Sequence, residues 1–137
     1  MDSNADIFNI FDQDKHFQEV MKRLLEDSMT FSFNGIMITE SGPGYPIRYV
    51  NPAFSEMTGY GPHEIYGKSP NILQGPKTDP EVLERLGQDI SVGRPFHGRA
   101  VNYRKDGSEF MMEWKIVPIR NATEEITHYL AIQREVS

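Results

Sequence analysis

Apolar and polar positions divide this chain into a helical beginning, a middle of short elements and a final third rich in strands. Between residues 13 and 28 apolar side chains recur every three or four positions, as on one face of an amphipathic helix. They are Phe17, Val20, Met21, Leu24 and Leu25. The apolar stripe of this predicted helix either covers the domain's own sheet or packs against a second subunit. Residues 1–12 show no clear period, and their structure stays open.

Five further segments are predicted to be β-strands. They are rich in β-branched and aromatic residues or alternate between apolar and polar positions, and sequences typical of turns separate the paired ones. A Ser-Gly-Pro-Gly run joins the first two, and Asp106-Gly107 favours a tight hairpin between the third and fourth. The predicted strands are residues 35–39, 47–51, 96–104, 109–119 and 126–136.

Short helices are predicted between the second and third strands. An Asx residue followed by proline is typical of a helix cap and a first helical residue, and this pair occurs at Asn51 and again at Asp79. We therefore expect helices over 52–58 and 62–66, and a longer one from Pro80. The stretch 67–75 between them is predicted to be a turn that faces a ligand.

This order of elements predicts an α+β fold. We expect a five-stranded antiparallel sheet with short helices on one face and the N-terminal helix flanking it. Residues 1–30 would form an arm and amphipathic helix, and residues 31–137 a single domain. A pocket would lie between the sheet and the short helices.

Alternation along the fourth predicted strand separates its two faces. Phe110, Met112 and Trp114 should point into the core or toward a ligand. Glu113 and Lys115 lie on the opposite face, which should therefore meet solvent or a partner.

Composition narrows the classes of function. The net charge of −6 and the interleaving of basic with acidic residues disfavour nucleic-acid binding. No apolar run approaches the roughly 18 residues of a membrane span, and no secretory leader is evident, so a cytoplasmic location is expected. With no cysteine, the 137 residues hold neither a disulfide nor a thiolate metal site.

Catalytic and metal motifs are not recognisable in this sequence. Its four histidines do not fall in pairs with metal-ligand spacing. Phosphate loops, nucleophile elbows and zinc-protease motifs are also absent. We expect a protein that is not an enzyme.

Several spaced motifs resemble the PAS domain family. They are Tyr-Val-Asn-Pro-Ala-Phe from residue 49, Met-Thr-Gly-Tyr from 57, Glu-Ile-Tyr-Gly-Lys from 64 and Asn-Tyr-Arg-Lys-Asp-Gly from 102. The run Ile-Leu-Gln-Gly-Pro-Lys-Thr-Asp from 72, and Ala-Ile-Gln from 131, are most similar to the LOV (light-oxygen-voltage) branch of that family. The resemblance implies a PAS fold and a flavin, FMN or FAD, as cofactor.

The same resemblance marks what this chain lacks. The photoactive cysteine of the LOV motif Asn-Cys-Arg-Phe-Leu-Gln-Gly falls on Pro70, and a second phosphate-binding arginine falls on Gly87. A flavin–cysteinyl adduct is therefore excluded. The positions that the resemblance places at a flavin are Gln74, Asn102 and Gln133, which keep the family's amides, and Ser69, Asn71 and Met112, which replace Asn, Arg and Asn.

Two functions follow from the resemblance. In the first, the domain is a sensor that holds a flavin and reports redox state or light without adduct chemistry, because an amide offers both a donor and an acceptor to the ring. In the second, it is a cofactor-free module for dimerisation or protein binding. We expect a homodimer through the N-terminal helix and the sheet face, and a signalling partner or output domain outside this sequence.

Overall fold

The computed structural model describes residues 15–137. The chain divides into two compact units, with the boundary between residues 31 and 32, and each unit is described by itself. The first described element is helix α2 (Lys15–Thr30), close to the predicted helix over 13–28. None of its residues is buried, and Val20, Leu24 and Leu25 of its apolar stripe are exposed. The predictions for residues 1–12, and for the first two residues of that helix, lie outside the described residues.

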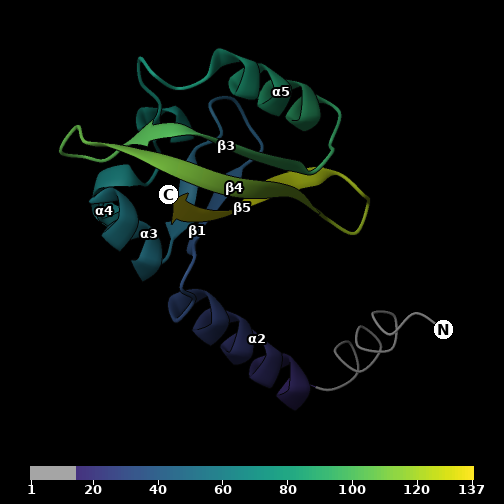
Figure 1. Ribbon diagram of the computed structural model, residues 1–137. Coiled ribbons are helices and arrows are strands. Elements are labelled where there is room, and N and C mark those ends of the chain that lie inside the picture. Colours follow the sequence, from purple (N-terminus) through teal and green to yellow (C-terminus); the bar gives the residue numbers. More distant parts are fainter. Residues whose placement is uncertain (1–14) are drawn as a thin grey trace. The chain divides into compact units, whose positions relative to one another are not determined.

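The second unit is built on a five-stranded antiparallel sheet in the order β2-β1-β5-β4-β3 (Figure 1). Its first and last strands are neighbours, so the C-terminal strand lies at the centre of the sheet. The bounds agree with the predicted strands to within one residue: β1 Gly35–Glu40, β2 Ile47–Val50, β3 Phe96–Tyr103, β4 Glu109–Arg120 and β5 Ile126–Val136.

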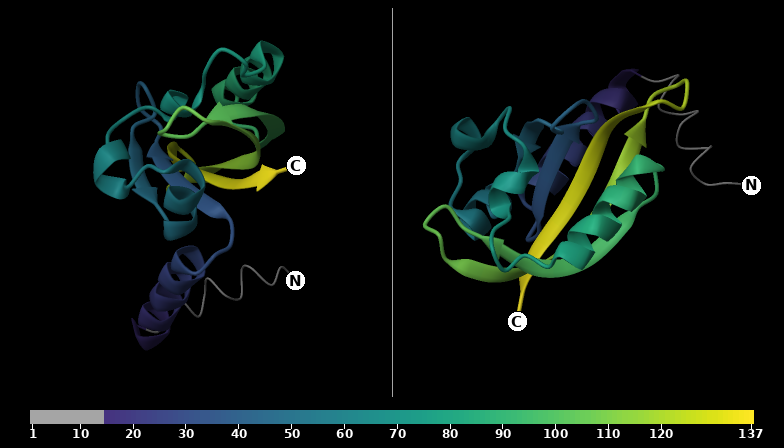
Figure 2. Two further views of the ribbon diagram at one scale, coloured as in Figure 1. Left: turned by 60° about the vertical axis from the view of Figure 1, so that its left-hand side comes forward. Right: turned by 90° about the horizontal axis from the view of Figure 1, so that it is seen from above.

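The helices of this unit gather on one face of the curved sheet, as Figure 2 shows from above. The predicted α+β architecture is therefore confirmed, with four helical elements where three were predicted. They are α3 (Pro52–Thr58), α4 (Pro62–Ile65), the 3₁₀ helix η1 (Pro70–Leu73) and α5 (Pro80–Ser91).

Local capping explains where two of these helices begin. The Asn51 side chain accepts a hydrogen bond from the Phe54 backbone N–H at 3.1 Å and another from Ile36 N–H at 2.7 Å. It thus caps α3 and fixes that helix to β1. Asp79 caps α5 by accepting from Glu81 N–H at 2.9 Å.

The core fills the space between the helices and the inner face of the sheet. Phe54, Ile65 and Phe96 are almost fully buried there. The predicted inward direction of Phe110, Met112 and Trp114 is confirmed, since each is 6% exposed or less. Lys115, on the outer face of β4, is exposed as predicted, whereas Glu113 beside it is buried.

Candidate ligand pocket

A cavity of about 470 Å³ lies between the inner face of the sheet, η1 and α5. This volume is in the range of small-molecule sites in proteins. All six predicted site residues line it: Ser69, Asn71, Gln74, Asn102, Met112 and Gln133. Asn102, Met112 and Gln133 are buried, Ser69 is half-buried, and Asn71 and Gln74 are exposed.

Helix η1 forms one wall of the cavity and replaces the predicted turn in that region. The Ser69 hydroxyl oxygen accepts from Asn71 N–H at 3.2 Å and caps the helix. Pro70 is its first residue. Proline is tolerated at this position because the backbone N–H of a first helical residue makes no hydrogen bond within the helix. The N–H of Gln74 donates to the Asn71 carbonyl at 3.0 Å, which closes the helix and fixes the backbone at Gln74.

The loop after Gln74 is attached to strand β3 by hydrogen bonds. Gly75 N–H donates to the Thr78 hydroxyl at 3.0 Å, and that hydroxyl donates to the Val101 carbonyl at 2.7 Å. Lys77 N–H donates to the Tyr103 hydroxyl at 2.9 Å, which brings the tyrosine ring against Gly75. A Cβ atom at Gly75 would lie 2.5 Å from Cδ2 and 2.8 Å from Cζ of that ring, so any other residue there would displace the ring.

The sheet contributes two buried amides to the cavity. Asn102, on β3, makes one long hydrogen bond from Nδ2 to the Ala100 carbonyl, at 3.3 Å. Gln133, on the central strand β5, is 3% exposed, and its Oε1 has no hydrogen-bond partner. Among the residues that the structure describes, only Ser55 Oγ shares this condition. An unpaired buried amide oxygen is unfavourable by about 1 to 3 kcal/mol, which points to a ligand that donates to it.

Two tyrosines and one face of α5 complete the lining; of these residues the sequence analysis named only Gly87. The rings of Tyr45 and Tyr129 meet edge to face with centroids 5.8 Å apart, and the Tyr129 hydroxyl donates to the Ile90 carbonyl at 3.4 Å. Burial raises the pKa of Tyr129. Strand alternation could have found Tyr129, because it points to the same face as Gln133, four residues on. Tyr45 lies in a turn with φ of 49°, and no local pattern indicates that it lines a cavity.

The residues of the cavity fit a flavin ring. Amides match a ring edge that carries both donors and acceptors, and Gln133 Oε1 has no hydrogen-bond partner within the protein. Met112, Trp114 and Leu73 offer apolar and aromatic walls for the flat faces of such a ring. Across residues 15–137, no cluster of three or more His, Cys, Asp or Glu suits a metal ion. In the same range, no helix has the length and apolar character needed to cross a membrane.

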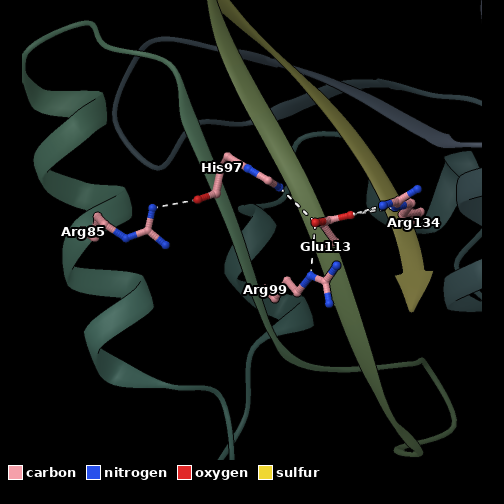
Figure 3. A network of polar contacts seen from close by, with 5 residues as sticks. All are labelled: Arg85, His97, Arg99, Glu113 and Arg134. Atoms are coloured by element: carbon pink, nitrogen blue, oxygen red, sulfur yellow. Dashed lines mark hydrogen bonds and ion pairs between the residues drawn. The ribbon is translucent and has the colours of Figure 1, made fainter. Parts of the chain in front are cut away.

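The outer face of the sheet carries a polar network centred on Glu113 (Figure 3). Its carboxylate accepts from Arg134 Nε at 2.7 Å and Arg99 Nε at 3.1 Å, and His97 Nε2 lies 3.0 Å away. These side chains cover Glu113, which is therefore buried, whereas Met111 and Lys115 on the same face are exposed. The hydrogen bonds from His97, Arg134 and Arg99 lower the pKa of Glu113 from its ordinary 4.5 to about 2.

The lowered pKa of Glu113 predicts a pH-dependent contribution to stability. Because the folded state holds the carboxylate ionised more strongly than the unfolded state does, this contribution is complete above about pH 4.5 and is lost as the pH falls toward 2. We expect the difference in urea midpoint between wild type and Glu113→Gln to shrink across that window. Glu109→Gln is the matched control, since Glu109 makes a single exposed pair with Lys77. A difference for Glu113→Gln that does not change with pH would contradict the network.

Comparison with known proteins agrees with this geometry. A model of the PAS domain family matches residues 33–137. Phototropin-2 of Oryza sativa subsp. japonica is 35% identical over 120 residues, which are 88% of this chain and 13% of that protein. This chain therefore corresponds to a small part of that relative.

Solved structures give the same assignment. A structure described as an RNA-binding light-oxygen-voltage receptor superposes with a TM-score of 0.82 at 28% identity, over 87% of this chain and 34% of that one. Another, described as "Flavin Analogue Sheds Light on Light-Oxygen-Voltage Domain Mechanism", has a TM-score of 0.78 at 32% identity, over 86% of this chain and 88% of that one. The chain belongs to the PAS domain family. Within it, the chain is similar to the LOV branch and lacks that branch's photoactive cysteine.

Proposed function

We propose that this chain is a sensory PAS domain that binds a flavin and reports its redox or light-excited state without thiol chemistry. The observation that carries the proposal is the unpartnered Oε1 of buried Gln133, inside a cavity whose other polar groups include the amides of Gln74 and Asn102. Relatives described as phototropins and LOV domains support a sensory role. We propose that the chain acts by binding and not as an enzyme.

Each lining residue has a part in this proposal. Asn102 and Gln133 would hold the polar edge of the ring from the sheet, and Gln74 would hold it from the end of η1. Met112 and Trp114 would pack on its apolar surface and keep water from it. The flavin itself would supply blue-light absorption and electron acceptance.

The fold offers a route from the cavity to the outer face of the sheet. Gln133 and Arg134 are consecutive on β5 and point to opposite faces. If the Gln133 amide turns when its partner on the ring changes, β5 can adjust, and Arg134 transmits that change to Glu113 on β4. The state of the ligand would thus shift the balance between alternative arrangements of the Glu113 network. A partner or output domain would read the change at this face.

Equilibrium binding tests the proposed function. Flavin added to the ligand-free chain at about 100 times its dissociation constant is expected to stabilise the fold by about 2.7 kcal/mol. The melting temperature should then rise by several degrees, and flavin fluorescence should change on binding. Ser55→Ala is the control variant, because Ser55 Oγ is also buried and unpartnered but does not line the cavity. An unchanged melting temperature at saturating flavin would reject the proposal.

A second function, dimerisation without a cofactor, is favoured by exposed apolar surface. Neighbouring strands bring apolar side chains together on the outer face of the sheet, through the register pairs Ile36–Ile132 and Leu130–Val117. Ile132 and Val117 are 39% and 37% exposed. We propose that a second copy of the chain covers these residues and the apolar stripe of α2. Light scattering should then find a dimer that Ile132→Glu dissociates and Gln88→Glu does not; a wild-type monomer at all concentrations would exclude it.

A further inference from the structure

The lining of the cavity carries no formal charge. None of the side chains that line it belongs to Asp, Glu, His, Lys or Arg. Its polar groups are amides, the hydroxyls of Ser69 and Thr39, two tyrosines and the indole N–H of Trp114. The face of α5 that borders the cavity consists of Leu83, Leu86, Gly87 and Ile90.

Three arginines, two of them on or just after α5 and one at the end of β4, make contacts with other groups. Arg85 of α5 donates to the His97 carbonyl at 2.6 Å and lies over the Phe96 ring, 4.9 Å from its centroid (Figure 3). Arg94, just after α5, pairs with Asp89 at 3.3 Å. Arg120 donates to the Glu124 carbonyl at 2.9 Å. No side chain of the lining would therefore supply a counter-charge to a negative group in the cavity.

A phosphate monoester carries between one and two negative charges near neutral pH. Moving such a group from water into a site without cations is strongly unfavourable, whereas hydroxyl groups need only neutral partners. The lining provides such partners in its amides and hydroxyls. Resting on the flavin-binding function proposed above, we infer that the cavity selects riboflavin, the uncharged flavin, over its phosphorylated forms FMN and FAD.

The test compares the affinities of riboflavin, FMN and FAD for the same purified chain, measured by quenching of flavin fluorescence at several salt concentrations. We expect riboflavin to bind roughly tenfold or more tightly than FMN, because a charge-assisted partner for phosphate is missing. Its affinity should also change little with salt. FMN or FAD binding as tightly as riboflavin, or more tightly, would overturn the selectivity while leaving flavin binding intact.

Two substitutions should reduce this preference. Gly87→Arg adds a cation on the cavity side of α5, where a Cβ atom would meet nothing within 4 Å. Asn71→Arg adds one at η1, where residue 71 is exposed. Each is expected to raise the ratio of FMN affinity to riboflavin affinity roughly tenfold.

Gly87→Gln and Asn71→Gln are the matched controls, because they add comparable length without charge. They should leave the ratio of the two affinities as in wild type. Equal gains for FMN from the Arg and Gln variants would overturn the electrostatic explanation. A chain that binds none of the three flavins would overturn both this inference and the proposed function.

Discussion

Replacing Gln133 with leucine is expected to stabilise the ligand-free chain and to weaken flavin binding. The Gln133 side chain is 3% exposed and its Oε1 has no partner, so the empty fold bears the penalty of an unpaired polar group. Leucine has a similar size and no polar atoms, and removing the penalty should add about 1 to 3 kcal/mol to the free energy of unfolding. The same change removes from the protein an acceptor for a hydrogen bond donated by the ligand. Flavin binding should therefore weaken tenfold or more.

Urea unfolding with and without flavin measures both effects for Gln133→Leu. Gln74→Leu is the matched control, because Gln74 lines the same cavity but is exposed, and its removal should not stabilise the ligand-free chain. Any bound flavin should also change its absorbance spectrum in Gln133→Leu. A ligand-free variant that is less stable than wild type, or one with unchanged affinity for flavin, would show that Gln133 does not serve a ligand.

Gly75→Ala is expected to destabilise the domain by about 3 kcal/mol, because a Cβ atom there meets the Tyr103 ring at distances below contact. If that ring moves aside, the hydrogen bond that its hydroxyl accepts from Lys77 N–H is lost. The loop that follows Gln74 should therefore separate from β3. Flavin affinity should fall together with stability, because the backbone at Gln74 continues into this loop.

Two comparisons isolate the steric cause in Gly75→Ala. Gly87→Ala should stabilise the chain by about 1 kcal/mol, because Gly87 lies inside α5 with free space around its Cα. In a Tyr103→Ala background, Gly75→Ala should destabilise the chain by much less than it does alone. Equal effects in both backgrounds would mean that the ring is not the obstacle.

Local chemistry made much of this fold predictable. Asn51 and Asp79, each followed by proline, mark the starts of α3 and α5 because a capping side chain acts within three residues of itself. Gly59, with φ of 80°, ends α3 for an equally local reason. Strand alternation placed Met112 and Trp114 inside because the period of two is a property of the backbone.

Other features depend on neighbours that are distant in the sequence. Strand alternation places Glu113 on the outer face of the sheet but does not show that it is buried there. Its burial depends on the pairing of β4 with β3 and β5, which brings Arg99 and Arg134 beside it. The resemblance to the LOV branch identified six residues that line the cavity. It did not identify Tyr45, which reaches the cavity from a turn whose position is set by the rest of the fold.

The measurement that tests the central claim most directly is the absorbance spectrum of the chain after separate incubation with riboflavin, FMN and FAD and removal of free ligand, recorded before and after blue illumination. We expect a retained flavin whose absorbance band is shifted by the protein. Blue light should cause no conversion of the kind that requires a cysteine thiol. A chain that stays colourless after incubation with each of the three flavins would contradict the claim that the cavity around Gln74, Asn102 and Gln133 holds a flavin.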